Sequence, residues 1–125
     1  MDRLEYHETA EYPVTVDLDE PSGLDILTCY YRLVRYGETH VRLSSSGKGI
    51  HMRCKARGLT KQQILDLRSF VGDDRLRVFY DTEAENKPFG ILFEVKNGKE
   101  SGEWTSDVYE AIDEYQHNIN GGMIP

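Results

Sequence analysis

The sequence is poor in cysteine, in apolar runs and in blocks of like charge, and each shortage excludes something. Its two cysteines, Cys29 and Cys54, stand where buried apolar residues would serve, which argues against a disulfide framework and a cysteine zinc site. No apolar run approaches membrane-spanning length and the first residues lack a signal-peptide core, so we expect a cytoplasmic protein without a membrane partner. The net charge of -7 argues against non-specific coating of nucleic acid.

Residues 14–19 are the most informative stretch of a chain that, at 125 residues, has room for one domain covering residues 1–125. Apolar and polar positions alternate here, which is typical of a half-buried strand. Asp17 and Asp19 share its polar face, and Pro21 ends the strand. Because neighbouring carboxylates repel unless a cation or a proton lies between them, the pair is a candidate divalent-metal site. A solvated strand end is the alternative.

Further segments alternate in the same way or show helical spacing. Residues 39–44, 50–55 and 76–81 are predicted strands, and residues 89–95 are predicted to turn at Asn97-Gly98 and return toward Trp104 as a hairpin. Helices are predicted from a cap at Ser22 to Gly37, from a capping box of Thr60 and Gln63 to Gly72, and from a cap at Ser106 to Asn120.

This order predicts an α+β fold, namely an RRM-like or ferredoxin-like split βαβ sheet (βαββαβ) with helices on one face, plus a C-terminal β-hairpin and helix. The polar positions of the strands would then share the uncovered face. Those positions are Asp17, Asp19, Arg42, His51, Arg53, Arg77 and Asp81. Phe79 would either stack on a base there or be covered by the hairpin, and we expect it to be covered.

The loop of residues 44–49 has small residues, hydroxyls and one ammonium, which suit an anion, although its spacing is not that of a Walker loop. Ser46, Lys48 and His51 would position a triphosphate beside the carboxylates. Three carboxylates on neighbouring strands can hold two divalent cations that activate a hydroxyl and stabilise a leaving pyrophosphate. The implied chemistry is nucleotidyl transfer. A basic cluster, made of Arg42, Arg53, Lys55 and Arg77, would contact nucleic acid.

Three segments between residues 12 and 83 resemble, in order, the motifs of the archaeo-eukaryotic primase superfamily. Residues 14–19 end in Asp-x-Asp, residues 45–51 form a small-residue turn closing on His51, and residues 78–81 end in an Asp. The middle segment is similar to the polymerase domain of bacterial ligase D. The resemblance implies Mg²⁺ or Mn²⁺ on Asp17, Asp19 and Asp81, and nucleotide phosphates on Ser46, Lys48 and His51.

The resemblance also implies a nucleoside triphosphate and a DNA or RNA template or primer as partners. Catalytic cores of this superfamily are usually longer, so the chain would be a minimal enzyme, one subunit of a larger replication enzyme, or a relic without polymerisation. Two other functions are open: a non-catalytic module for single-stranded nucleic acid or nucleotide, and a metal-dependent nuclease or phosphodiesterase. His51 as a plain surface residue and Asp81 as a turn former are the simplest alternatives.

Overall fold

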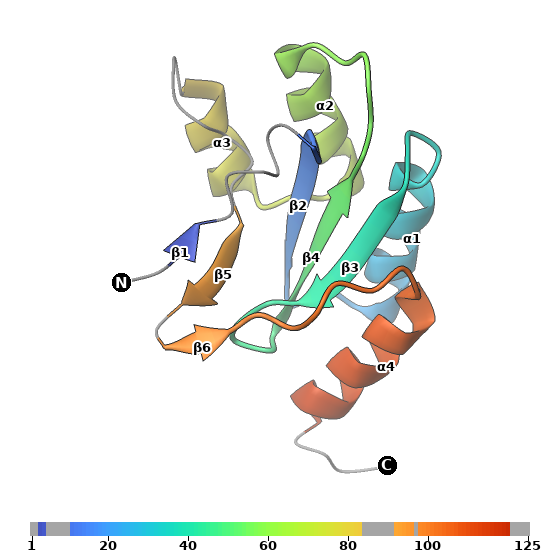
Figure 1. Cartoon of the computed structure of the whole chain (residues 1–125), viewed down its shortest axis with the longest axis vertical. Coiled ribbons are helices and arrows are strands. Elements are labelled where there is room, and N and C mark those ends of the chain that lie inside the picture. The colour runs from blue at the N-terminus through green and yellow to red at the C-terminus, as the bar shows by residue number, and fades with distance from the viewer. Residues whose placement is uncertain (1–2, 5–10, 84–91, 97, 121–125) are drawn as a thin grey trace.

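The computed structural model describes residues 3–4, 11–83, 92–96 and 98–120, and it confirms an α+β fold (Figure 1). Within this part of the chain, no helix is long and apolar enough to cross a membrane. The elements, in order, are β1 (Arg3–Leu4), β2 (Val14–Asp19), α1 (Gly23–Leu33), β3 (Thr39–Leu43), β4 (Gly49–Cys54), α2 (Lys61–Val71), α3 (Arg75–Glu83), β5 (Phe93–Lys96), β6 (Lys99–Glu100) and α4 (Val108–Ile119).

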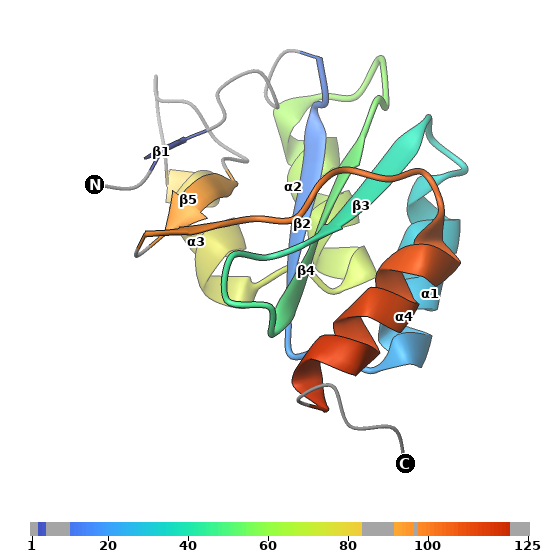
Figure 2. The same ribbon diagram turned by 60° about the horizontal axis from the view of Figure 1, so that its bottom comes forward.

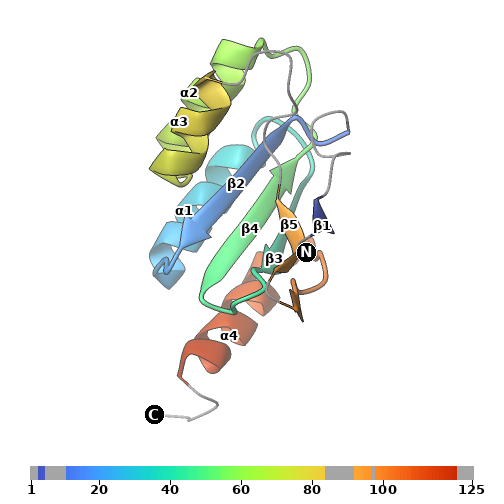
Figure 3. The same ribbon diagram turned by 90° about the vertical axis from the view of Figure 1, so that its left-hand side faces the viewer.

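The main sheet has the order β2-β4-β3, and both outer strands run antiparallel to β4. β2 and β3 therefore point the same way, with α1 connecting them. In this register His51 of β4 lies between Asp17 of β2 and Arg42 of β3. A second small sheet has the order β1-β5-β6. It lies on the side of the main sheet opposite α1 and α2 (Figure 3).

The apolar core lies between the main sheet and the helices α1, α2 and α4. The strand positions predicted to face inward are buried, which confirms the phase of β2, β3 and β4. The strand residues of this core are Val14, Val16, Leu18, Val41, Leu43, Ile50, Met52 and Cys54. The alternating polar positions consequently point to the other side of the sheet, where β5 and β6 lie.

Two helix starts agree with their sequence signals, and one differs by a residue. Ser22 forms a capping box at the start of α1, and Thr60 forms one at the start of α2, which ends at Gly72 with a φ of 98°. The predicted cap at Ser106 is wrong, because the carboxylate of Asp107 accepts the N–H groups of Tyr109 and Glu110.

The predicted hairpin is present where the structure describes it. β5 and β6 pair antiparallel, with Lys96 opposite Lys99, and Gly98 has the positive φ of 77° that a tight turn requires. The predicted beginning of this hairpin, residues 89–91, and Asn97 lie outside the described residues.

The predicted strand over residues 76–81 is wrong, because these residues belong to α3. Asp74 begins this helix: its Oδ1 accepts the N–H groups of Leu76 and Arg77. Leu76, Phe79 and Tyr80 are all exposed, so the alternation of apolar residues has no buried face. The prediction that Phe79 is covered is also wrong, since 56% of its surface is exposed.

The edge of β2 that does not pair with β4 is hydrogen-bonded to the segment that leads into α3. The predicted strand over residues 76–81 would have paired at this edge. The Asp73 carboxylate accepts the N–H of Asp17 at 2.8 Å, and the N–H of Asp74 donates to the carbonyl of Asp17 at 3.1 Å. Arg77 donates to the carbonyl of Thr15 at 3.1 Å. A side-chain and turn network therefore replaces the fourth strand.

The edge of β3 is bonded to the segment between β6 and α4. Val41 and Thr105 exchange two backbone hydrogen bonds of 2.8 Å, and Gly102 donates to the carbonyl of Leu43 at 2.9 Å. Figure 2 shows this segment crossing the sheet on its way to α4. It carries Trp104 onto the polar side of the sheet, so that side is partly covered.

Candidate functional site

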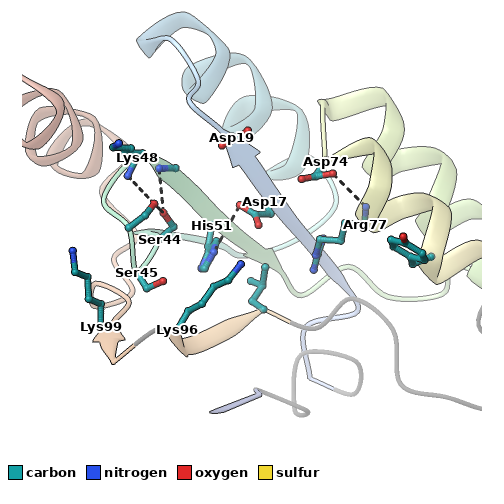
Figure 4. A pocket seen from close by; sticks show the side chains of 14 residues that line it. Asp17, Asp19, Ser44, Ser45, Lys48, His51, Asp74, Arg77, Lys96 and Lys99 are labelled. Carbon is teal, nitrogen blue, oxygen red and sulfur yellow. Dashed lines mark hydrogen bonds and ion pairs between the residues drawn. The ribbon is translucent and has the colours of Figure 1, made fainter. Parts of the chain in front are cut away.

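A pocket of about 840 Å³ lies on the polar side of the main sheet (Figure 4). β2, β4, the 44–49 loop, the start of α3 and the β5–β6 hairpin contribute to its walls. Its volume falls in the range of small-molecule sites. The charged and polar residues that line it are Asp17, Asp19, Ser44, Ser45, Ser46, Lys48, His51, Asp74, Arg77, Tyr80, Lys96 and Lys99.

Asp17 is the acidic centre of the pocket. Its backbone is fixed on one side by β4 and on the other by Asp73 and Asp74. Burial raises the pKa of the Asp17 carboxyl to about 6; Arg77 opposes this, while the nearby carboxylates of Asp73, Asp74 and Asp19 add to it. Burial is therefore the main reason that this carboxyl resists ionisation, and Arg77 offsets it only in part.

His51 is buried beside Asp17, with Nε2 at 3.8 Å from Asp17 Oδ1. Its Nδ1 accepts a hydrogen bond of 3.0 Å from Nε of Arg42. Burial, followed by the positive charges of Arg42, Arg77 and Lys96, lowers the pKa of His51 well below its ordinary value. His51 is therefore neutral near pH 7, and it lies on the pocket side of the sheet, as its strand phase predicted.

In the 44–49 loop, side chains rather than the backbone N–H groups of residues 47–49 are available to bind a ligand. Gly47 donates to the carbonyl of Ser44, Lys48 donates to Oγ of Ser46, and Gly49 donates to Oγ of Ser44. The backbone cradle expected from small residues is thus used within the loop itself. Ser46 and Lys48 are exposed at the pocket wall, so their hydroxyl and ammonium groups remain the donors for a ligand.

Of the three predicted carboxylates, the pocket contains Asp17 and Asp19. Asp81 is on α3, where its Oδ2 binds Nη1 of Arg68 at 2.7 Å, and it does not line the pocket. Asp74 lines the pocket instead. Within the described ranges, no three or more His, Cys, Asp or Glu side chains are grouped closely enough to hold a metal ion.

Arg42 and Arg53, predicted to contact nucleic acid, make contacts within the protein. The guanidinium of Arg42 lies 4.2 Å from the ring centre of Trp104. The guanidinium of Arg53 lies 4.0 Å from the ring centre of Tyr12 and 4.3 Å from that of Trp104, and its Nε donates to Nδ1 of His40 at 3.1 Å. Aromatic rings therefore cover both cations.

Lys55 and Arg77, the other two predicted contacts, also have partners. Lys55 lies within ion-pair range of Glu11 and Glu38, at 3.7 and 3.5 Å. Arg77 donates to Asp73 at 2.7 Å, and it lines one wall of the pocket from α3 rather than from a strand. The four predicted contacts thus do not form one exposed basic face.

Sequence reasoning missed Asp74, Tyr80, Lys96 and Lys99 as pocket residues. Asp74 had a usable signal, since an Asp two residues after the helix-ending Gly72 is a good helix cap. The lysines also had one, because they flank the Asn97-Gly98 turn and must lie close together at the tip of a hairpin. Nothing in the sequence placed that tip beside β2 and β4.

No protein-family model matches the chain, and neither the curated proteins nor the solved structures provide a match.

Proposed function

We propose that the pocket binds a nucleoside triphosphate and that the protein is a metal-dependent nucleotidyl transferase of the primase-polymerase type. The observation that carries this proposal is the meeting of two chemically different groups in one pocket. Carboxylates of Asp17 and Asp19 face hydroxyls and cations of the 44–49 loop and the β5–β6 hairpin, with His51 between them. A triphosphate with its divalent cation needs both kinds of group.

Two carboxylates on the acidic side of the pocket, those of Asp17 and Asp19, would be the protein ligands of Mg²⁺ or Mn²⁺. Asp17 and Asp19 lie near the C-terminal end of β2, and burial raises the pKa of Asp17, an effect that a bound cation would oppose by favouring the ionised carboxylate. A bound cation supplies Lewis-acid activation of an attacking hydroxyl and stabilises a leaving pyrophosphate. The carboxylates of Asp17 and Asp19 would hold that cation.

The opposite wall fits the phosphates. Lys48, Lys96 and Lys99 supply positive charge, and Ser45 and Ser46 supply hydroxyl donors. Such donors are most effective where charge develops on the leaving phosphates. Tyr80, which is exposed at the pocket edge, offers a ring on which a base can stack.

We also infer that the main sheet is a shortened RRM-like sheet. β2, α1, β3, β4 and α2 follow that fold's chain order, and β4 pairs between β2 and β3. The segment from Asp73 to Arg77 occupies the edge of β2 that a fourth strand would use. β2 and β4, which carry the segments that resemble primase motifs, are adjacent strands.

The test is an extension assay with a primed template, Mn²⁺ and labelled nucleotides. We expect extension by the wild-type protein and its loss in Asp17→Ala, because the pocket loses its central carboxylate. Asp113→Ala is the matched control: this Asp is exposed on α4, outside the pocket, and its removal should leave extension unchanged. Absence of any metal-dependent product from wild-type protein would contradict the proposal, and shortened template would indicate a nuclease.

Nucleotide binding without catalysis is the second candidate, and the position of Asp81 favours it. A carboxylate neutralised by Arg68 at 2.7 Å is a poor third ligand for catalytic cations. This candidate predicts that a nucleoside triphosphate binds with Mn²⁺ and that Asp17→Ala weakens the binding, while no primer is extended.

A further inference from the structure

Two Arg–His pairs with reversed order connect β3 and β4. Arg42 lies opposite His51, and two residues along the same strands His40 lies opposite Arg53. In each pair the arginine Nε donates to the histidine Nδ1, at 3.0 Å for Arg42 and 3.1 Å for Arg53. The two pairs therefore share one hydrogen-bond geometry and differ in the group that Nε2 of the histidine faces.

The hydrogen bond from Arg42 determines where His51 carries its proton. A guanidinium has donors only, so Nδ1 of His51 must be the acceptor and must lack a proton. A neutral imidazole with a bare Nδ1 carries its hydrogen on Nε2. That nitrogen faces Asp17 at 3.8 Å, a separation longer than a hydrogen bond, at the wall of the pocket.

Trp104 holds Arg42 in the position that this hydrogen bond requires. Its ring lies 4.2 Å from the guanidinium of Arg42, and Arg42 is 3% exposed. The ring also lies 4.3 Å from the guanidinium of Arg53, so a single indole supports both pairs. The support comes from the segment that pairs with the edge of β3 and is therefore fixed to the sheet.

We propose that Arg42 is a positioning residue that fixes neutral His51 with its proton on Nε2, so that the imidazole donates a hydrogen bond to an anionic group bound in the pocket. The identity of that anion as a nucleotide phosphate rests on the proposed function. The state of the imidazole does not, because the contacts that fix it exist without a ligand.

The charged groups around His51 favour the same state. Arg42 faces it from β3, Asp17 from β2, Arg77 from α3 and Lys96 from β5. Three of these are cations, and together with burial they oppose protonation of the imidazole.

The decisive experiment is made on the wild-type protein, and a variant serves only to assign the His51 signal. Long-range proton–nitrogen NMR spectra of the ¹⁵N-labelled, nucleotide-free protein distinguish the two neutral forms of histidine from the charged one. His51 is identified by the signal lost in His51→Asn. We expect His51 to keep its proton on Nε2, because Nδ1 accepts the hydrogen bond from Arg42. A proton on Nδ1, or a charged ring near pH 7, would overturn the proposal.

Arg42→Met and Arg53→Met form a matched pair of variants. Each removes one guanidinium from under Trp104 and keeps an apolar stem. Arg42→Met should allow both neutral forms of His51 and weaken ATP binding in the presence of Mn²⁺ about fivefold. Arg53→Met should change only His40. Equal changes in His51 from both variants would refute a specific role for Arg42.

The NMR and binding results separate the two proposals. If His51 carries its proton on Nε2 in the wild type and ATP does not bind, the positioning by Arg42 is supported and the nucleotide function is refuted.

Discussion

At the scale of single residues, Asp17 is a buried carboxyl whose ionisation opposes folding. Its backbone is held by bonds to Asp73 and Asp74, which bring two further carboxylates close to its own. The pKa of Asp17 rises to about 6, above the ordinary value of an aspartate. The folded protein therefore binds this proton more tightly than the unfolded chain, and ionisation of Asp17 destabilises the fold.

The sign of this effect predicts how Asp17→Asn changes thermal stability. The contribution of Asp17 is fully favourable below about pH 4 and is lost as the pH rises through about 6. We expect Asp17→Asn to raise the melting temperature by about 3 °C near pH 7.5 and to leave it nearly unchanged near pH 4. Differential scanning calorimetry at the two pH values measures this, with Asp113→Asn as an exposed control. A loss of stability near pH 7.5 would contradict the prediction.

Residue periodicity predicted part of the site, and physical reasons explain the rest. It placed Asp17, Asp19 and His51 on the polar side of the sheet, because side chains of a strand alternate between faces. It could not show that Arg42 and Arg53 would lie under Trp104, since a period of two identifies a face and not what covers it. Coverage depends on contacts between distant segments.

At the scale of elements, α3 is where local pattern and structure disagree most. A strand needs one buried face, but every residue of α3 is at least partly exposed. Its position is fixed by charge: Asp73, which has a fully buried side chain, binds Arg68 at 2.6 Å and Arg77 at 2.7 Å. A sequence pattern of apolar residues contains no information about such a network.

This network predicts unequal costs for removing its two aspartates. Asp73→Ala leaves the buried Arg68 and the partly exposed Arg77 without their shared partner and releases the N–H of Asp17, so we expect a loss of about 3 to 5 kcal/mol in the free energy of unfolding. Asp81→Ala removes one partly exposed partner of Arg68, and we expect a loss of about 1 to 2 kcal/mol. Urea denaturation of both variants compares them, and equal losses would contradict the assignment of Asp73 as the central acceptor.

At the scale of the whole molecule, both edges of the main sheet and part of its polar side are occupied by the protein's own segments. Asp73, Asp74 and Arg77 bond to the edge of β2, and residues 102–105 run along the edge of β3. The apolar side and its cover by α1 and α2 followed from the sequence, whereas the position of α4 did not. The cover on the polar side did not, because it depends on where the C-terminal hairpin packs.

This cover limits how strongly the molecule can bind single-stranded nucleic acid. The cations most exposed at the pocket are Lys48, Lys96 and Lys99. Less exposed are Arg42, Arg53, Lys55 and Arg77, which lie against aromatic rings or carboxylates. With about 0.7 counterions released per phosphate contact on a single strand, three lysines give a slope of about -2 in a plot of log affinity against log salt.

All seven cations together would give a slope of about -5, so the salt dependence distinguishes the covered sheet from an open basic face. Fluorescence anisotropy of a labelled oligothymidylate between about 20 and 200 mM salt measures the slope. Lys99→Ala should make it shallower by about 0.7, and Arg53→Met should leave it unchanged, since that guanidinium lies between Tyr12 and Trp104. A slope near -5 that becomes shallower in Arg53→Met would mean that the aromatic cover opens when nucleic acid binds.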